Sequence, residues 1–280
     1  MLPRSFLYVP ASRPALFAKA AASGADAVIL DLEDAVPTAE KDEARAAVAA
    51  WLDGERPAGG PPTWVRVDAA ALAPDVAAAV RPGIDGLIVA KCSRAALADV
   101  ADLLEQREAE HDLAPVPVVG LVEDAAALVD LAAITAHPRL TTLGVGEVDL
   151  LGDLRLTRGP STVHAVNQLR LQIVLHCAAA GLAAPVAPTS TDFRDLEAFR
   201  RTTHELVDLG FRSRTAVHPA QVPVIHEVLA PDQAQAAAAQ DVVDRFVAAA
   251  GGVTVDANGR LIDAAVIRAA KETLARHSSA

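Results

Sequence analysis

The strongest constraint on the fold is the alternation of eight short apolar runs with longer segments of helical spacing. The apolar runs predict strands at Ser5–Pro10, Ala27–Glu33, Thr63–Asp68, Gly86–Cys92, Pro117–Glu123, Leu140–Gly146, Ala183–Thr189 and Arg212–His218. Alanine-rich segments between them predict helices, among them Arg13–Ser23, Lys41–Leu52, Arg94–Glu110, Ala125–Ala136, Val163–Ala180 and Asp195–Leu209. Strands and helices that alternate in this way form parallel sheets, and eight such units close a barrel. We therefore predict an α/β fold of the (β/α)₈ TIM-barrel type.

An open, doubly wound sheet is the alternative for the same alternation. Such a sheet usually has a glycine-rich phosphate-binding turn after its first strand. The first predicted strand is followed instead by Pro10-Ala11-Ser12-Arg13-Pro14, which argues against that fold. The regular pattern is interrupted at Glu147–Thr162, a stretch rich in Gly, Asp and Arg that we interpret as a long active-site loop.

The chain continues beyond the eighth unit for longer than a barrel needs. Gln233–Ala250 and Ala264–Arg276 are helical in pattern. Between them Gly251–Arg260 is interpreted as a hairpin, because it contains an Asn-Gly turn. We predict a catalytic barrel over residues 1–230, and over residues 231–280 a lid or an arm that packs on a neighbouring subunit.

Composition and charge restrict the partners. A nucleic-acid-binding protein needs a basic face to displace counterions from phosphates, whereas this chain has a formal net charge of −11 and no Lys/Arg cluster. An anionic small molecule could still bind at a local basic site or a metal ion. No run reaches the length of a membrane span and no signal-peptide pattern is present, so we expect a cytoplasmic protein without membrane contact. Cys92 and Cys177 are expected to be buried free thiols.

Apolar strands of this chain repeatedly end in a polar or charged group. The residues concerned are Asp31, Glu33, Asp34, Arg66, Asp68, Lys91, Glu123, Glu147, Asp149 and His218. In a parallel barrel the carboxyl ends of all strands lie on one face, and that face carries the chemistry. A single polar terminus is explained as well by a strand that ends where solvent begins, but the coincidence of so many favours an active site.

Glu123 and Asp149 follow adjacent predicted strands, so their carboxylates could lie close enough to repel each other unless a cation lies between them. Two carboxylates, with the remaining positions left to water or substrate, suit Mg²⁺, which polarises carbonyls and stabilises enolates. The alternative for Glu123 is a structural role at the N-terminus of the helix that Glu123-Asp124 opens.

Arg66 would lie beside this metal site, where its guanidinium could bind a substrate carboxylate through two parallel hydrogen bonds. The alternative for Arg66 is an ion pair with Asp31 or Glu33 on the next strand. His218 precedes a proline, which keeps its backbone extended, and it is either a substrate ligand or a residue that positions a loop.

Several short motifs follow one another in a specific order along nearly the whole chain. They are Arg4–Pro10, Ile29–Val36, Val65–Val67, Leu121–Glu123, Gly146–Leu150, Leu209–Phe211, Val217–Val222 and Gly259–Asp263. Together they resemble the HpcH/HpaI aldolase and citrate lyase β-subunit-like family of CoA-ester lyases. The order and number of the motifs make the resemblance specific.

The resemblance implies a TIM-type barrel in a homotrimer or a hexamer, with Mg²⁺ on Glu123 and Asp149 and a substrate carboxylate on Arg66. Coenzyme A would be part of the substrate. The resemblance also implies that Asp263 is an acid/base that reaches the site of a neighbouring subunit. A helix N-cap is the other role for Asp263, and the two roles are compatible.

The chain departs from the family pattern at several positions. Relatives usually have Asn at the position of Asp68, Pro at Ala90 and Glu at Val148. Their seventh strand usually contains Ile-Asp where this chain has Ala184–Thr189, and Arg212–Arg214 replaces their usual Gly-Lys. The metal end of the site is therefore expected to be intact, whereas the acyl group is left open.

We predict a Mg²⁺-dependent carbon–carbon lyase that cleaves or forms a 3-hydroxyacyl-CoA ester of the citramalyl- or malyl-CoA kind. The other reactants would be an acetyl-CoA-type thioester and a 2-oxo acid. A metal-dependent aldolase that acts on free 2-oxo acids without CoA, and a non-catalytic barrel subunit, stay open as alternatives. The candidate residues are Arg66, Asp263 and Glu33 as catalytic groups, Arg66, Lys91, Glu123 and His218 as substrate ligands, Arg13 and Lys19 as coenzyme A contacts, and Glu123 and Asp149 as metal ligands.

Overall fold

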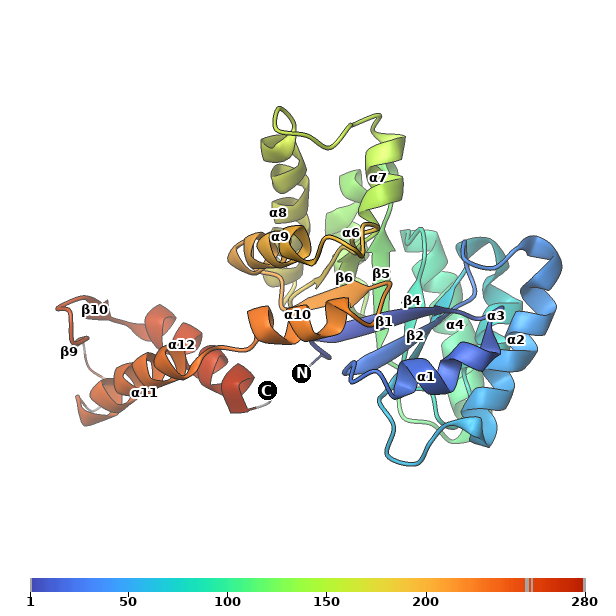
Figure 1. The fold of residues 1–280 in the computed structure, drawn as a ribbon, viewed down its shortest axis with the longest axis horizontal. Coiled ribbons are helices and arrows are strands. Elements are labelled where there is room, and N and C mark those ends of the chain that lie inside the picture. The colour runs from blue at the N-terminus through green and yellow to red at the C-terminus, as the bar shows by residue number, and fades with distance from the viewer. Residues whose placement is uncertain (1, 250–251, 253, 279–280) are drawn as a thin grey trace. The chain divides into compact units, whose positions relative to one another are not determined.

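The computed structural model describes residues 2–249, 252 and 254–278, and the chain divides into two compact units, Met1–Ile225 and His226–Ala280. The first unit is a closed barrel of eight parallel strands in the order β1 to β8 (Figure 1). The strands are β1 (Ser5–Pro10), β2 (Ala27–Asp31), β3 (Thr63–Val67), β4 (Gly86–Val89), β5 (Val118–Val122), β6 (Leu140–Val145), β7 (Val186–Ala187) and β8 (Ser213–Ala216). The predicted (β/α)₈ barrel is confirmed, and all eight predicted strands are present.

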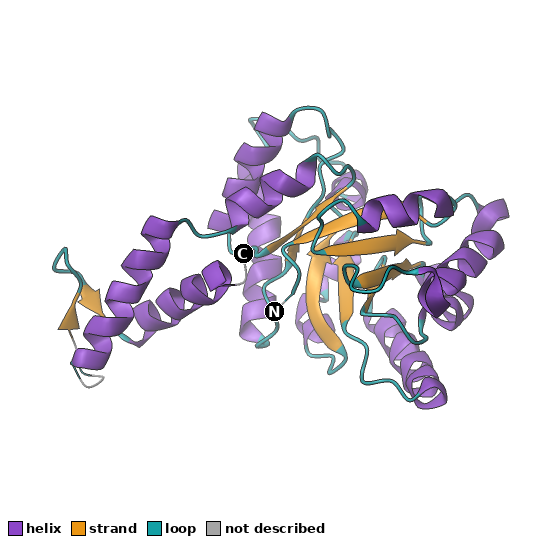
Figure 2. Ribbon diagram, turned by 60° about the horizontal axis from the view of Figure 1, so that its bottom comes forward, coloured by secondary structure: helices purple, strands orange, loops and turns teal. Residues whose placement is uncertain are grey.

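Helices follow the strands and cover the outside of the barrel (Figure 2). They are η1 (Pro14–Leu16), α1 (Phe17–Ala21), η2 (Thr38–Glu40), α2 (Lys41–Ala50), η3 (Trp51–Glu55), η4 (Ala69–Ala71), α3 (Leu72–Ala79), α4 (Arg94–His111), α5 (Ala125–Val129), α6 (Leu131–Thr135), α7 (Glu147–Asp153), α8 (Val163–Ala179), α9 (Leu196–Asp208) and α10 (Gln221–Leu229). The predicted helix Ala125–Ala136 is divided into α5 and α6, because the backbone of Asp130 leaves the helical conformation. Among the described residues no helix combines the length and apolar character that crossing a membrane requires.

The stretch Glu147–Thr162 begins with a helix, so the predicted long loop is wrong for residues 147–153. Gly146 is the N-cap of α7, and Glu147 and Asp149 lie in its first turn. Carboxylates are stabilised there by the partial positive charge of the helix N-terminus. The glycine and acidic residues that suggested a loop are thus the normal composition of a helix start.

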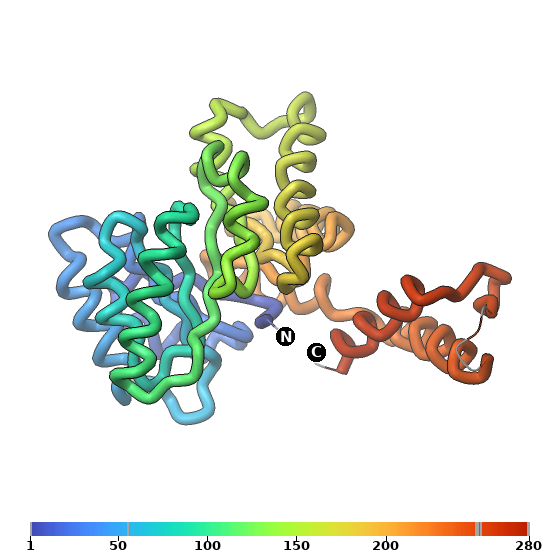
Figure 3. Tube along the Cα trace, turned by 180° about the vertical axis from the view of Figure 1, so that it is seen from behind, coloured from blue at the N-terminus to red at the C-terminus, as the bar shows by residue number. Residues whose placement is uncertain are grey.

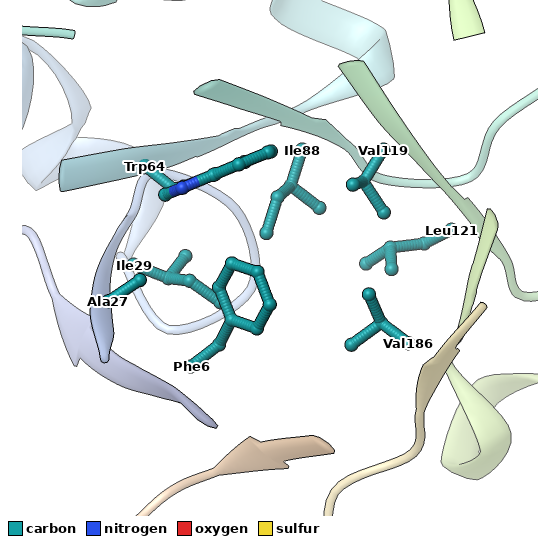
Figure 4. Packing of buried hydrophobic residues seen from close by; sticks show 8 residues of the cluster. All are labelled: Phe6, Ala27, Ile29, Trp64, Ile88, Val119, Leu121 and Val186. Atoms are coloured by element: carbon teal, nitrogen blue, oxygen red, sulfur yellow. The ribbon is translucent and has the colours of Figure 1, made fainter. Parts of the chain in front are cut away.

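Inward-facing apolar side chains fill the centre of the barrel (Figure 4). The buried cluster consists of Phe6, Ala27, Ile29, Trp64, Ile88, Val119, Leu121 and Val186. The rings of Phe6 and Trp64 meet edge to face with centroids 5.4 Å apart. Gly86 leaves the space that the indole needs, since a Cβ at this position would lie 2.4 Å from the ring. Cys92 and Cys177 are buried free thiols, as predicted.

The second unit begins inside α10, a few residues before the boundary predicted at residue 230. It contains α11 (Gln233–Ala248), β9 (Thr254–Val255), β10 (Leu261–Ile262) and α12 (Ala264–Ser278). α11 and α12 pack side by side (Figure 3). β9 and β10 pair antiparallel, so the predicted hairpin is present, although Gly251 and Val253 of it lie outside the described residues, as does Ala250 of the predicted helix.

Candidate functional site

A cavity of about 300 Å³ lies at the carboxyl ends of the barrel strands. Its polar lining consists of Tyr8, Asp31, Arg66, Glu123, Glu147, Asp149, Thr189 and Thr215. Side chains alternate between the two faces of a strand, and the residues two positions before Tyr8, Asp31, Arg66 and Glu123 all belong to the buried cluster. These four polar side chains therefore point into the barrel, directly above its apolar centre.

Glu123 is buried at the end of β5 and faces the neighbouring strand. Its Oε2 accepts a hydrogen bond of 2.5 Å from the backbone N–H of Lys91, which follows β4 with a left-handed φ of 47°. On the other side, a Cβ at Gly146 would lie 2.2 Å from Glu123 Oε1. Glycine is therefore required at residue 146 for the carboxylate to fit.

The helix after β5 does not need Glu123 as its cap. Asp124 is the N-cap of α5, and its Oδ1 accepts a hydrogen bond of 2.7 Å from the N–H of Ala127. The capping role that was the alternative for Glu123 thus belongs to its neighbour, and the carboxylate of Glu123 is directed to the cavity.

Burial raises the pKa of Glu123 to about 7. The hydrogen bond from the Lys91 N–H and the charge of Arg66 act against this rise, whereas the carboxylates of Glu33 and Asp149 add to it. Asp149 lies in the first turn of α7, is exposed and lines the same cavity. Asp149 is thus close enough to Glu123 for its charge to raise the pKa of Glu123.

The donor set and the charge of this cavity fit Mg²⁺. Apart from Glu147, which is neutralised by arginines, its lining has three carboxylates, Asp31, Glu123 and Asp149, against one guanidinium, that of Arg66, a formal charge of −2. Hard oxygen ligands are what Mg²⁺ prefers, and it usually takes only one or two carboxylates from a protein. The described residues hold no group of three or more His, Cys, Asp or Glu that could bind a metal. Because Asp31 is paired with Arg66, the candidate metal ligands of this cavity are Glu123 and Asp149.

Arg66 forms both of the ion pairs that were its alternative role. Its Nε and Nη2 lie 2.7 and 2.6 Å from the two oxygens of Asp31, and its Nη1 lies 3.0 Å from Glu33 Oε2. The guanidinium also packs over the ring of Tyr8, with 5.0 Å from Cζ to the centroid. A guanidinium has five N–H donors, and two of those of Arg66 make hydrogen bonds to the described residues, both to Asp31. The ion pairs therefore fix the side chain while leaving donors for a ligand.

Glu33 forms ion pairs with both Arg66 and Lys91. Lys91 Nζ donates a short hydrogen bond to Glu33 Oε1 and lies 3.7 Å from Asp34. Burial acts to raise the pKa of Glu33, but the hydrogen bond from Lys91 and the charge of Arg66 outweigh it and lower this pKa. Glu33 is thus an ionised bridge between two cations and is not among the residues that line the cavity.

Three other candidate residues lie outside the cavity lining. Arg13 and Lys19 are exposed in the segment that joins β1 to β2. His218 is also exposed; its ring stacks on Phe193 with centroids 4.9 Å apart, and its Nδ1 accepts a hydrogen bond from the N–H of Ala220. The contacts of His218 are those of a residue that positions a loop, the alternative given for it above.

Asp263 belongs to the second unit, where it starts α12. Its Oδ1 accepts hydrogen bonds of 2.9 and 3.0 Å from the N–H groups of Ala265 and Val266. These bonds lower the pKa of Asp263. The side chain is exposed, so the N-cap role leaves its carboxylate ionised and accessible.

Sequence reasoning did not assign two residues that shape the cavity. Tyr8 is the only tyrosine of the chain, and the strand period that places Phe6 inside the barrel would have identified it. Glu147 is buried, and its carboxylate is held by Arg170, with contacts of 2.7 and 2.8 Å, and by Arg158. No local pattern indicates those partners, because they lie on a later loop and on α8.

Comparisons with known proteins identify the family of this chain. The model of the HpcH/HpaI aldolase/citrate lyase family matches residues 4–219. The chain belongs to this family. A (3S)-malyl-CoA thioesterase of Cereibacter sphaeroides is 32% identical over 98% of this chain and 94% of that protein. An L-malyl-CoA/beta-methylmalyl-CoA lyase of the same species is 30% identical over 96% of this chain and 92% of that protein.

A solved structure that contains bound ligands has the same fold as this chain. The protein CitE from Mycobacterium tuberculosis, in complex with magnesium, acetoacetate and coenzyme A, matches with a TM-score of 0.79 and 28% identity over 99% of this chain and 98% of that chain. Family membership confirms the predicted enzyme class, a carbon–carbon lyase. The expected cofactors, Mg²⁺ and coenzyme A, are the ligands of that structure.

Proposed function

We propose that this chain is a Mg²⁺-dependent lyase that cleaves or forms a 3-hydroxyacyl-CoA ester of the malyl- or citramalyl-CoA kind. The products of cleavage would be an acetyl-CoA-type thioester and a 2-oxo acid. The observation that carries the proposal is the cavity in which the fixed guanidinium of Arg66 lies among the carboxylates of Asp31, Glu123 and Asp149. The formal charge of −2 in this cavity repels an anionic substrate unless a divalent cation is present.

The metal ligands would be Glu123 and Asp149. Bound Mg²⁺ supplies polarisation of substrate oxygens and stabilises negative charge that develops on them. Gly146 and the Lys91 N–H hold the Glu123 carboxylate in position, and the first turn of α7 presents Asp149 to the same space. The rigid support of both ligands by a strand end and a helix start favours a preorganised site.

Arg66 would bind the carboxylate of the 2-oxo acid portion of the substrate. Its pairs with Asp31 and Glu33 leave N–H donors for this task and prevent the side chain from rotating away. A guanidinium that is fixed before the substrate arrives stabilises the developing keto oxygen without reorganisation at the moment of reaction.

The base would be Asp263 from a second copy of the chain, in a homotrimer or a hexamer. In cleavage its carboxylate takes the proton of the substrate hydroxyl, the carbon–carbon bond breaks, and the electron pair passes to the α-carbon of the thioester. Return of the proton to that carbon completes the acetyl group. The exposed position of Asp263 supports this role.

The decisive experiment is a product analysis with malyl-CoA and citramalyl-CoA in the presence of Mg²⁺. We expect equal amounts of acetyl-CoA and of the 2-oxo acid, and no activity on the free hydroxy acids. Glu123→Gln should lose the activity, whereas Glu105→Gln, a substitution on the exposed face of α4, should keep it. Full Mg²⁺-dependent lyase activity in the Glu123→Gln variant would overturn the site.

The same assay separates the rival activities. A thioesterase, the activity named for one relative, would release free coenzyme A thiol and an intact hydroxy acid. An aldolase that does not use CoA would cleave free substrates, and a non-catalytic subunit would bind Mg²⁺ without turnover. Any of these three outcomes refutes the CoA-ester lyase.

A further inference from the structure

A second cavity, of about 430 Å³, lies outside the barrel wall between α8 and α9. Arg214 of β8 lines it, together with Arg170 of α8 and Arg158 of the loop after α7. Thr215, the next residue of β8, lines the first cavity. Because neighbouring side chains of a strand point to opposite faces, Arg214 points out of the barrel and toward the helices.

Arg214 is a buried cation without an acidic partner. Its side chain is 3% exposed, and no carboxylate of the described residues lies within ion-pairing distance. Its hydrogen bonds go to neutral oxygens: Pro188 O at 3.2 Å, Phe199 O at 3.0 Å and the hydroxyls of Thr202 and Thr203. Removing a charge from water without a counter-charge is strongly unfavourable. Burial accordingly lowers the pKa of Arg214 to about 9.

The two other arginines of this cavity add positive charge. Arg158 and Arg170 share one carboxylate, that of Glu147, so this wall holds three guanidiniums and one neutralising anion. Arg170 is the neighbour that lowers the pKa of Arg214 most after burial. The positive charge of these three arginines therefore exceeds that of the one carboxylate with which they form ion pairs.

The acidic residues that line the same cavity, all of them described, form no ion pair with its three arginines. Asp192 Oδ1 accepts backbone N–H groups of its own loop, and Asp195 Oδ1 accepts the N–H of Ala198 as the N-cap of α9. Glu205 is exposed, so water screens its charge. The hydroxyl oxygen of Thr189, which also lines the cavity, is buried without a partner among the described residues.

We propose that this second cavity binds a small oxyanion, such as phosphate, sulfate or the carboxylate of an organic acid. Arg214, Arg170 and Arg158 would donate to its oxygens, and Thr189 would add a hydroxyl donor. Planar guanidiniums that converge on one space are the groups that recognise such anions. The site shares the lining residue Thr189 with the first cavity, but its three arginines do not line that cavity, and the proposal does not depend on the proposed lyase activity.

The test is anion titration of the full chain by calorimetry and by thermal unfolding, at an ionic strength held constant with sodium chloride. Phosphate, sulfate and acetate are titrated separately, so that the preferred oxyanion is identified. We expect saturable binding of at least one of them and a rise in Tm that saturates with it. Arg214→Gln and Arg158→Gln should each weaken this binding by about tenfold or more, as expected for a lost charge-assisted hydrogen bond.

Arg194→Gln is the matched control, because Arg194 is exposed in the neighbouring loop and does not line the cavity. Its affinity should equal that of the wild type. Arg158 has a side chain that is 53% exposed, so Arg158→Gln leaves the core intact and decides the question if Arg214→Gln does not fold. Neither residue lines the first cavity. Absence of saturable binding, or equal affinity in all the variants, would overturn the proposal.

Discussion

Glu123→Gln should make the metal-free protein more stable at alkaline pH while it abolishes Mg²⁺ binding. Glu123 has a pKa of about 7 in the folded chain, against an ordinary value of 4.5. Between these two values the folded state holds a proton that the unfolded state has released. Stability from this group is therefore fully present below about pH 4.5 and is lost as the pH rises through 7.

The size of this loss follows from the two pKa values. A difference of one unit between the folded and the unfolded pKa corresponds to about 1.4 kcal/mol. Ionised Glu123 therefore destabilises the fold by about 3 kcal/mol at pH 8. Glutamine cannot ionise, and its side-chain oxygen can still accept the N–H of Lys91. The variant should exceed the wild type by about 3 kcal/mol at pH 8 without metal and by less than about 1 kcal/mol at pH 5.

Urea unfolding at pH 5, 6, 7 and 8, with a chelator present, measures both curves. Glu105→Gln is the control, because this exposed residue of α4 should leave the pH dependence of the wild type unchanged. A stability difference between Glu123→Gln and wild type that does not change between pH 5 and pH 8 would refute the reasoning, and so would a variant that is less stable at pH 8.

Mg²⁺ should remove most of the difference in stability between the two proteins at pH 8. A metal at a hundredfold excess over its Kd stabilises the state that binds it by about 2.7 kcal/mol. We expect this gain in the wild type at pH 8 and its absence in Glu123→Gln. An equal gain in both proteins would show that Mg²⁺ binds elsewhere.

Three further predictions concern the same site. Gly146→Ala should weaken Mg²⁺ binding by more than about tenfold, since its Cβ would displace the Glu123 carboxylate, whereas Gly152→Ala, which has no atom within 4 Å of the added Cβ, should not, and calorimetry of both variants checks this. Arg66→Lys should lower kcat/KM by about a hundredfold, because a single ammonium cannot replace the fork that binds both a substrate carboxylate and its own partners; an unchanged value would contradict this role. Asp263→Asn should lower kcat by about a hundredfold or more with an unchanged far-UV spectrum, because Asn also caps a helix but is no base, and retained turnover would remove Asp263 from the mechanism.

The fold could be predicted from local sequence because each barrel unit is local. Short apolar runs become strands buried on both faces, and alanine-rich segments become the helices that cover them. The error at residues 147–153 has a simple cause. Gly146, Glu147 and Asp149 form the start of α7, and residues that favour a helix N-terminus are the same residues that favour loops.

Strand endings also predicted which side chains belong to one face of the barrel. Arg66, Glu123 and Asp149 line one cavity because parallel strands bring their carboxyl ends together. Sequence left open whether Arg66 binds a ligand or forms an ion pair, and the structure shows the pairs with Asp31 and Glu33 together with unused donors. That outcome depends on the distance between strands that are far apart in sequence.

Sequence by itself determined the barrel and the face that carries the polar groups, and it supplied the two carboxylates proposed as metal ligands. Only the tertiary structure decided that Glu123 accepts a hydrogen bond from the Lys91 N–H and packs against Gly146, and that burial raises its pKa. It alone revealed that Arg214 is buried, with no acidic partner among the described residues. Periodicity is a property of neighbours along the chain, whereas burial and ion pairing are properties of neighbours in space.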